Sequence, residues 1–177
     1  MSIKSTPTHY GSVAVAIHWF TSLLIVLLFA TGLLAAGQAD PAAKVVLLRA
    51  HIPLGAGALL LTLFRIVWWL VADLHPTAPA DQPAWQQWAA RAVHVGLYLV
   101  VLVAASSGIA TIVLSGALPA IIGSAALPNF ESILPRLVHG GVTKLMLALL
   151  VLHVAAALYH QFVRRDHLLQ RMGIGGV

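Results

Sequence analysis

The sequence predicts an all-α integral membrane protein that folds as one antiparallel bundle of four transmembrane helices. Of its 177 residues, 60% are hydrophobic and only 8% are charged, a composition far from that of soluble globular domains. The mean hydropathy is +0.93. About 20 apolar residues cross a hydrocarbon core of about 30 Å, and four apolar stretches of at least this length follow one another along the chain. We therefore expect residues 1–177 to form a single transmembrane domain.

The four expected spans are separated by loops rich in glycine, proline and aspartate. They cover approximately residues 13–36, 45–72, 92–114 and 137–163. The first stretch is too long for the core of a signal peptide and is not followed by a cleavage pattern and a soluble domain. We therefore expect it to be retained as a helix.

The basic residues predict that both termini face the cytoplasm, because positive charge accumulates on that side of membrane proteins. With this orientation the cytoplasmic ends carry Lys4, Arg65, Arg91, Arg164, Arg165 and Arg171, against Lys44, Arg49 and Arg136 outside. The net charge of +5 is scattered over helix ends and forms no continuous stripe, which argues against a nucleic-acid partner. Membrane lipid is the expected surrounding.

Histidine is the residue type that carries the functional signal. The chain has nine histidines, and the expected spans contain His18, His51, His94, His139, His153 and His160. Ionisable groups in lipid are costly and usually functional, although a single one is often only a hydrogen-bonded helix contact. The pattern therefore matters more than any member. His9, His75 and His167 fall in tails or loops and are assigned no role.

The spacing of His139 and His153 predicts ligands at two depths of the membrane. They are 14 residues apart, so they share a helix face and are separated by about 21 Å along the axis. In an antiparallel bundle His18 lies at the depth of His153, here called the inner pair, and His51 at the depth of His139, the outer pair. Two b-type haems stacked across a membrane need such a ligand set. The absence of cysteine excludes thiolate metal sites and covalently attached haem.

Two further histidines leave alternatives open. His94 lies near the cytoplasmic start of the third span, so the residues alone do not exclude it as an inner ligand. His160 lies about 10 Å nearer the cytoplasm than His153, too far to bind the same iron, and is level with His94. His94 and His160 could bind the carbonyl oxygens of a quinone and relay its protons. Hydrogen bonds to lipid or to a loop are the alternative.

Basic residues surround the outer pair and predict a positive potential at that mouth of the bundle. They are Lys44, Arg49, Arg136 and Lys144. They could neutralise haem propionates, which we favour, or draw in a small anionic substrate, and the two roles can coexist. Arg65, 14 residues past His51, could also meet a propionate, but we expect it to snorkel to the nearer interface.

Five short motifs, in this order and spacing, resemble the bacterial cytochrome b561 family over essentially the whole chain. They are Ala16-Ile17-His18-Trp19, Arg49-Ala50-His51, Ala92-Val93-His94-Val95-Gly96, Val138-His139 and Leu152-His153-Val154-Ala155-Ala156-Ala157-Leu158-Tyr159-His160. The resemblance implies a dihaem four-helix bundle in the bacterial inner membrane. It implies that His18 and His153 hold a cytoplasmic haem b, that His51 and His139 hold a periplasmic one, and that His94 and His160 belong to a quinone site.

The resemblance also implies an activity. Short, stand-alone members of the family oxidise superoxide at the periplasmic haem and reduce ubiquinone, so we expect a superoxide:ubiquinone oxidoreductase. A second reading is an electron-transfer subunit whose outer face docks a redox protein, such as a dehydrogenase or hydrogenase. Such subunits usually carry longer loops or extra spans, which favours the self-contained unit. A transporter that uses histidines as transient metal ligands ranks third, because the spans are almost wholly apolar between the two histidine levels.

Overall fold

The computed structural model describes residues 2–78, 82–166 and 168–174, and within them it contains helices and no strand. The long helices are α1 (Ser12–Gly37), α2 (Pro41–Val71), α3 (Ala84–Ser115) and α5 (Leu134–Leu158), the last continuing into the π-helical turn η1 (Tyr159–Arg164). All four are long and apolar enough to cross a membrane. The predicted fold class, a bundle of four transmembrane helices, is confirmed.

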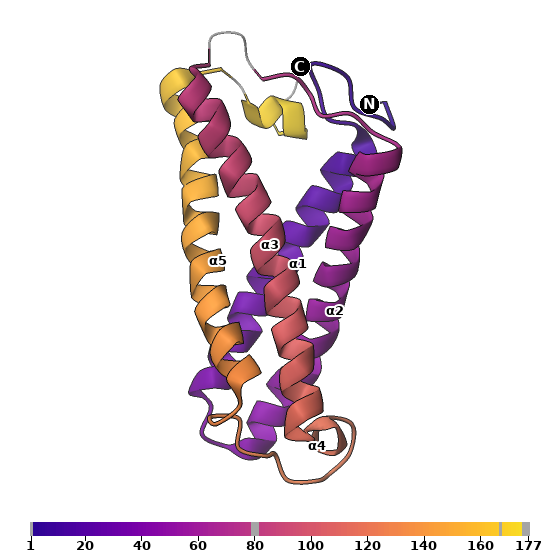
Figure 1. Ribbon diagram of the computed structural model, residues 1–177, viewed down its shortest axis with the longest axis vertical. Coiled ribbons are helices and arrows are strands. Elements are labelled where there is room, and N and C mark those ends of the chain that lie inside the picture. Colours follow the sequence, from indigo (N-terminus) through magenta and orange to yellow (C-terminus); the bar gives the residue numbers. More distant parts are fainter. Residues whose placement is uncertain (1, 79–81, 167, 175–177) are drawn as a thin grey trace.

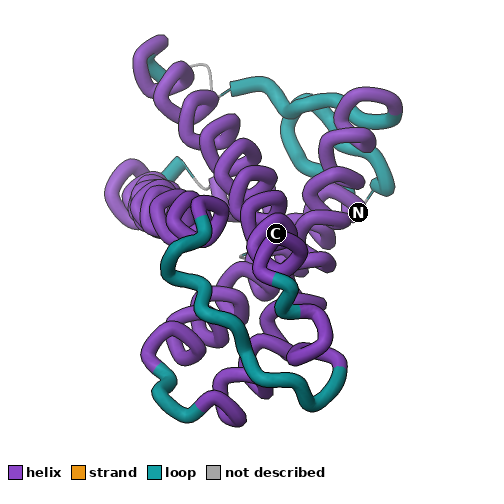
Figure 2. The backbone as a smooth tube through the Cα atoms, turned by 60° about the horizontal axis from the view of Figure 1, so that its bottom comes forward, coloured by secondary structure: helices purple, strands orange, loops and turns teal. Residues whose placement is uncertain are grey.

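The bundle is built from two helical hairpins. Helix α1 packs chiefly against α2, and α3 chiefly against α5. Both termini lie at one end of the molecule, called here the terminal end, and the α1–α2 and α3–α5 connections lie at the opposite end (Figure 1). Loops are confined to these two ends (Figure 2). As expected for successive spans with short connections, α2 and α5 run from the opposite end towards the terminal end.

Local signals set the helix ends. Asp40 caps α2 by accepting hydrogen bonds from the backbone amides of Ala42 and Ala43, at 3.1 and 3.2 Å. Helix α3 ends at Gly116, whose φ of 66° is the left-handed conformation that glycine adopts without strain. Helix α3 begins at Ala84, well before the apolar stretch predicted from residue 92, because the helix continues through a polar turn that carries Trp85 and Trp88.

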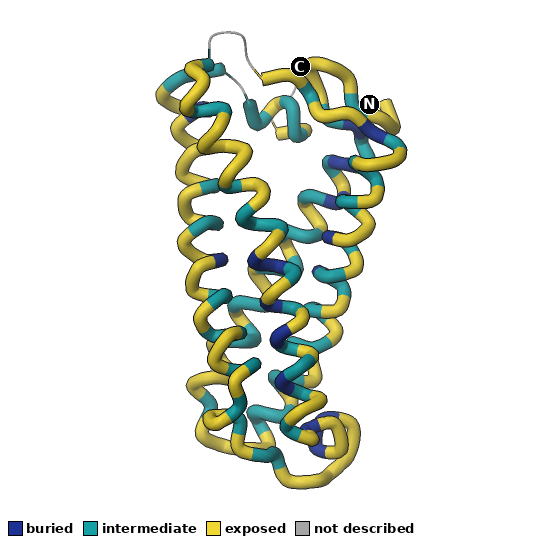
Figure 3. Tube along the Cα trace, in the orientation of Figure 1, coloured by how far each residue is buried: buried dark blue, intermediate teal, exposed yellow. Residues whose placement is uncertain are grey.

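Large apolar side chains are exposed along all four long helices, and only a few residues between the two ends are buried (Figure 3). Phe20, Leu60 and Leu70 are 64%, 66% and 78% exposed. Water would not tolerate so much apolar surface on a monomer, whereas lipid chains solvate it. The protein is therefore a multi-pass membrane protein.

A small apolar cluster separates the two histidine levels inside the bundle. Val100, Val101 and Met146 are buried there, and Ile25 and Phe29 of α1 pack against them. Met146 lies seven residues from both His139 and His153. The interior between the two histidine levels is therefore apolar, as the sequence predicted.

The terminal end is closed by a cap made from segments far apart in the sequence. The short helix η2 (Leu168–Met172) lies at this end (Figure 1), where the indole of Trp19 donates a hydrogen bond to the Met172 carbonyl at 3.1 Å. The carboxylate of Asp73, 7% exposed, accepts hydrogen bonds from the amide and hydroxyl of Ser5 and from the Trp68 indole, at 2.7, 2.8 and 3.0 Å. Burial raises the pKa of Asp73, but these bonds and one from the following amide outweigh it and lower the pKa below its ordinary value.

Two short helices were not predicted from the sequence. One is η2, and the other is α4 (Leu118–Ile122), in the connection between α3 and α5. The guanidinium of Arg49 fastens α4 to α2 by donating hydrogen bonds to the carbonyls of Ile121 and Gly123. These contacts join residues more than 70 positions apart, so no local pattern announces them.

Candidate functional site

The structure brings four of the predicted histidines together as two facing pairs. In the inner pair, His18 of α1 faces His153 of α5, with ring centroids 6.2 Å apart and ring planes at 58°. In the outer pair, His51 of α2 faces His139 of α5, again at 6.2 Å and with planes at 74°. Each pair joins one helix of the α1–α2 hairpin to α5 of the other hairpin.

The separation of 6.2 Å has a chemical meaning. A bond from an imidazole nitrogen to a transition metal is about 2.0 Å long, and the ring centre lies about 1.1 Å beyond the nitrogen, so two axial imidazoles on one iron have centres about 6 Å apart. Both pairs match this value. His94 also approaches His153, but at 5.2 Å, which is too close for the two rings to share an iron. The geometry therefore favours His18 over His94 as the partner of His153.

The outer pair has its Nδ1 atoms occupied by hydrogen-bond partners. Nδ1 of His51 lies 3.0 Å from the Thr31 hydroxyl, which itself donates to the Leu27 carbonyl at 2.8 Å. Nδ1 of His139 lies 2.8 Å from the Ala104 carbonyl. An acceptor at Nδ1 keeps the proton there and leaves Nε2 free to bind a metal. The two rings are therefore fixed in the tautomer that an axial ligand needs.

Glycines leave room beside both outer imidazoles. A Cβ placed on Gly32 would lie 3.0 Å from Cε1 of His51, and one on Gly108 would lie 3.4 Å from Cε1 of His139. A Cβ at position 32 would press on the His51 ring, and one at position 108 would only touch the His139 ring. This cradle and the ring separation show that the residues present fit a bis-histidine haem.

The inner pair has a cation beside it. Nη1 of Arg65 lies 3.3 Å from Nδ1 of His18, and its guanidinium carbon lies 5.8 Å from the ring centre of Tyr98. The Arg65 side chain thus lies against His18 of the inner pair. From the sequence we had expected it to extend towards the nearer membrane interface. The π-face of Tyr98 stabilises a cation there, and this contact is set by tertiary packing alone.

The two histidines predicted to form a quinone site lie in different surroundings. Nδ1 of His94 contacts the Ala90 carbonyl of its own helix at 2.6 Å, and its ring lies against His153. His160 is buried in η1, and its Nδ1 contacts Oδ2 of Asp166 at 2.5 Å. Within the described residues no ring contact joins His94 to His160. Turns of π-helix recur at functional sites, and the pairing with Asp166 had no local signal in the sequence.

The four basic residues predicted around the outer pair do not form one cluster. Arg49 donates hydrogen bonds to the carbonyls of Ile121 and Gly123 at the end of α4, and Lys144 is exposed. Nη1 of Arg136 lies within 3.1 Å of a Cβ built on Gly140, the residue after His139. Lys44 is half-buried in the first turns of α2. Arg136 is thus the one of the four whose side chain lies next to the residue that follows His139.

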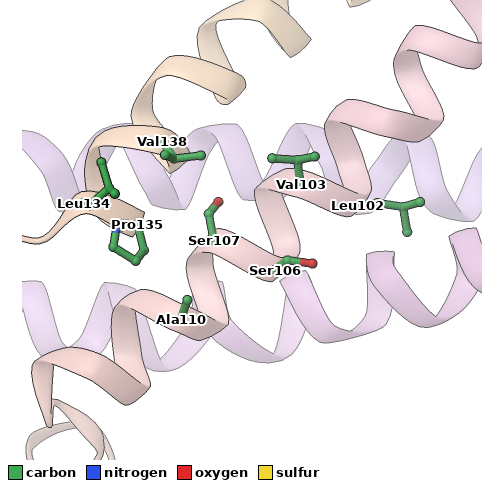
Figure 4. A pocket seen from close by; sticks show the side chains of 8 residues that line it. All are labelled: Leu102, Val103, Ser106, Ser107, Ala110, Leu134, Pro135 and Val138. Carbon is green, nitrogen blue, oxygen red and sulfur yellow. The ribbon is translucent and has the colours of Figure 1, made fainter.

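A shallow apolar groove lies beside the outer pair, between α3 and α5. Its volume is about 420 Å³, and it is lined by Leu102, Val103, Ser106, Ser107, Ala110, Leu134, Pro135 and Val138 (Figure 4). The hydroxyl of Ser107 lies 3.4 Å from Nδ1 of His139. The groove therefore reaches the back of one ligand and is separate from the space between the facing rings.

Fold and site together define a class of protein: a multi-pass membrane protein whose helices present facing imidazoles for a porphyrin iron. No group of three or more histidine or acidic side chains suited to a metal ion occurs among the described residues, and a haem iron needs only two. The family model for prokaryotic cytochrome b561 matches residues 9–175. The chain belongs to this family and is a haem b protein of membrane electron transfer.

Two relatives from Escherichia coli (strain K12) extend this match over nearly the full length. Cytochrome b561 homolog 2 is 25% identical over 184 aligned positions, covering 97% of this chain and 95% of the relative. Cytochrome b561 homolog 1 is 27% identical over 170 positions, covering 92% and 96%. The family predicted from the histidine motifs is therefore confirmed.

Proposed function

We propose that the chain holds two haems b, one at the inner pair and one at the outer pair, and moves electrons across the bacterial inner membrane. The observation that carries this proposal is the equal ring separation of 6.2 Å in both pairs. Because α5 contributes one ligand to each pair, the two irons would lie at depths set by a single helix. Bound haem supplies a one-electron carrier at each level.

The chain's own residues perform the remaining tasks. Thr31 and the Ala104 carbonyl orient the outer imidazoles through Nδ1, and Gly32 and Gly108 give them room. The apolar cluster around Met146 excludes water between the two levels. A dry interior favours electron transfer between fixed carriers over reaction with solvent.

We further propose that the electron acceptor is ubiquinone, bound at the terminal end near His94 and His160. Reduction of a quinone to a quinol consumes two electrons and two protons. The Asp166 carboxylate contacts Nδ1 of His160 and holds the imidazole in place, which leaves Nε2 free to relay protons to the quinone. With both termini cytoplasmic, as proposed, these protons come from the cytoplasm.

The proposed donor is superoxide, which approaches the outer pair from the periplasm. Two superoxide anions each give up one electron and leave as dioxygen, which balances the two electrons taken by one quinone. The positive charges of Lys44, Arg136 and Lys144 raise the local concentration of a small anion. This charge supports superoxide as the donor, and the same residues can also contact haem propionates.

Haem content, spectra and activity test the proposal together. Purified protein should contain two haems b per chain, and superoxide generated enzymatically should drive reduction of a soluble ubiquinone analogue at a rate that falls as salt is added. One haem per chain would refute the paired sites. Two haems without superoxide-driven quinone reduction would support the electron-carrier role and refute superoxide as the donor. Turnover that needs an added dehydrogenase or hydrogenase would identify a subunit role.

Paired variants test the inner ligand. His153→Ala should remove one haem and leave the other, whereas His94→Ala should retain both and lose quinone reduction. If His94→Ala removes a haem and His18→Ala does not, the inner pair has been assigned to the wrong helix.

A further inference from the structure

Arg65 is a cation inside the bundle without an acidic partner in the part of the chain that the structure describes. Its Nε is buried and makes no hydrogen bond. The ion pairs among the described residues involve His160, Arg164 and Asp166, and none involves Arg65. Its polar contact through Nη1 is with Nδ1 of His18, at 3.3 Å.

This arrangement is unfavourable unless an anion joins it. An unpaired charge within the membrane is costly, because it loses the hydration that water would give it. Moreover, when Nε2 of His18 binds iron, its Nδ1 carries the proton and meets the guanidinium donor to donor. An anionic oxygen that accepts from these donors would remove both penalties.

The spacing along α2 explains why Arg65 lies at this depth. It follows His51 by 14 residues, the same interval that separates His139 from His153 on α5. Both helices run in the same direction, and 14 residues keep the same face after about 21 Å. Helix α2 therefore presents an imidazole at the outer level and a guanidinium at the inner level.

We propose that Arg65 binds a propionate of the haem at the inner pair and raises the reduction potential of that haem. This rests on the proposed haem at His18 and His153. Reduction adds one negative charge to the haem, and a nearby cation in a low-dielectric site stabilises the reduced form. Arg49 and Lys144 at the outer level are exposed and are therefore screened by salt, whereas Nε of Arg65 is buried. Arg65 thus makes the inner haem the preferred destination of the electron.

Redox titration of the purified holoprotein, followed by haem absorbance, tests this inference. The inner component is assigned as the one missing from His153→Ala. In Arg65→Gln the equilibrium constant for reducing the inner haem should fall at least tenfold, which is 59 mV for one electron, with the outer component unchanged. Arg65→Lys should keep most of the wild-type value. The matched control is Arg91→Gln, which removes an exposed cation that stacks on Trp88 at 5.6 Å and should leave both components in place.

The outcomes separate this inference from the function on which it rests. A single redox component in the wild type refutes the two-haem proposal itself. Two components that are both unchanged in Arg65→Gln overturn only the role of Arg65. Selective loss of the inner haem from Arg65→Gln supports anchoring through the propionate. If Arg65→Gln loses both haems, the Arg65→Lys variant decides the question. An intact inner component in Arg65→Lys supports the role of the positive charge. Loss of both haems in Arg65→Lys overturns that role.

Discussion

Replacing Gly32 by alanine would place a methyl group against the imidazole of His51, the proposed outer haem ligand. The new Cβ would lie 3.0 Å from Cε1 of the imidazole, whereas carbon atoms in contact prefer about 3.5–4.0 Å. The ring must therefore yield by about 0.5 Å. Thr31 holds the ring at Nδ1, and in the proposed haem site iron would hold it at Nε2, so it could not simply rotate away. Overpacking of this kind costs about 1–3 kcal/mol, which corresponds to outer-haem binding that is about 5- to 140-fold weaker.

The assay is haem retention, measured as the spectrum and haem content of the purified variant during competition with a soluble haem acceptor. Gly108→Ala, whose Cβ would lie 3.4 Å from Cε1 of His139, should show a smaller effect, and Gly141→Ala, where nothing lies within 4 Å, should show none. Equal haem retention in all three variants would refute the close fit between Gly32 and the ligand ring.

Three further outcomes follow from contacts elsewhere in the molecule. Thr31→Val removes the Nδ1 partner of His51 and should weaken outer-haem binding by about 10- to 100-fold, measured by the same competition. The pKa of Asp73 is lowered in the folded protein, so the Asp73 carboxylate stabilises the fold fully above its ordinary pKa of 3.8. This stabilisation is lost as the pH falls through the lower pKa of the folded state. The midpoint temperature of thermal unfolding should therefore stay constant from about pH 7 to pH 5 and decline below about pH 4. Asp73→Asn should unfold at a lower temperature at neutral pH, and its unfolding temperature should decline less in acid. Asp166→Asn should leave the haem spectrum intact and slow quinone reduction about tenfold or more, because the His160 imidazole loses the contact that holds it for proton relay; an unchanged rate would show that Asp166 has no part in the proton path.

The composition alone determined the fold class, because a chain with so few charges and four long apolar stretches cannot bury its surface in water. Glycine, proline and aspartate marked the loops between the spans, but the start of α3 at Ala84, eight residues before the predicted span, was not predicted. Helical periodicity also placed His139 and His153 on one face, since 14 residues make nearly four whole turns. These properties depend on neighbours within a helix, which a sequence displays directly.

Tertiary structure decided what depends on contacts between helices. The ring separations of 6.2 and 5.2 Å that distinguish His18 from His94 as the partner of His153 arise from the packing of α1 and α3 around α5. The commitment of Arg49 to α4 and the pairing of His160 with Asp166 likewise have no sequence signal.

Arg65 shows the difference most clearly. Its position in the sequence gave its depth, and an arginine near a helix end is expected to extend towards water. Only the folded bundle shows its guanidinium against His18 and Tyr98. The sequence by itself placed histidines at two depths of a membrane bundle and Arg65 at one of these depths, because helix geometry is local. Which of them face each other was decided by side-chain packing between helices, because that packing joins residues that the chain holds far apart.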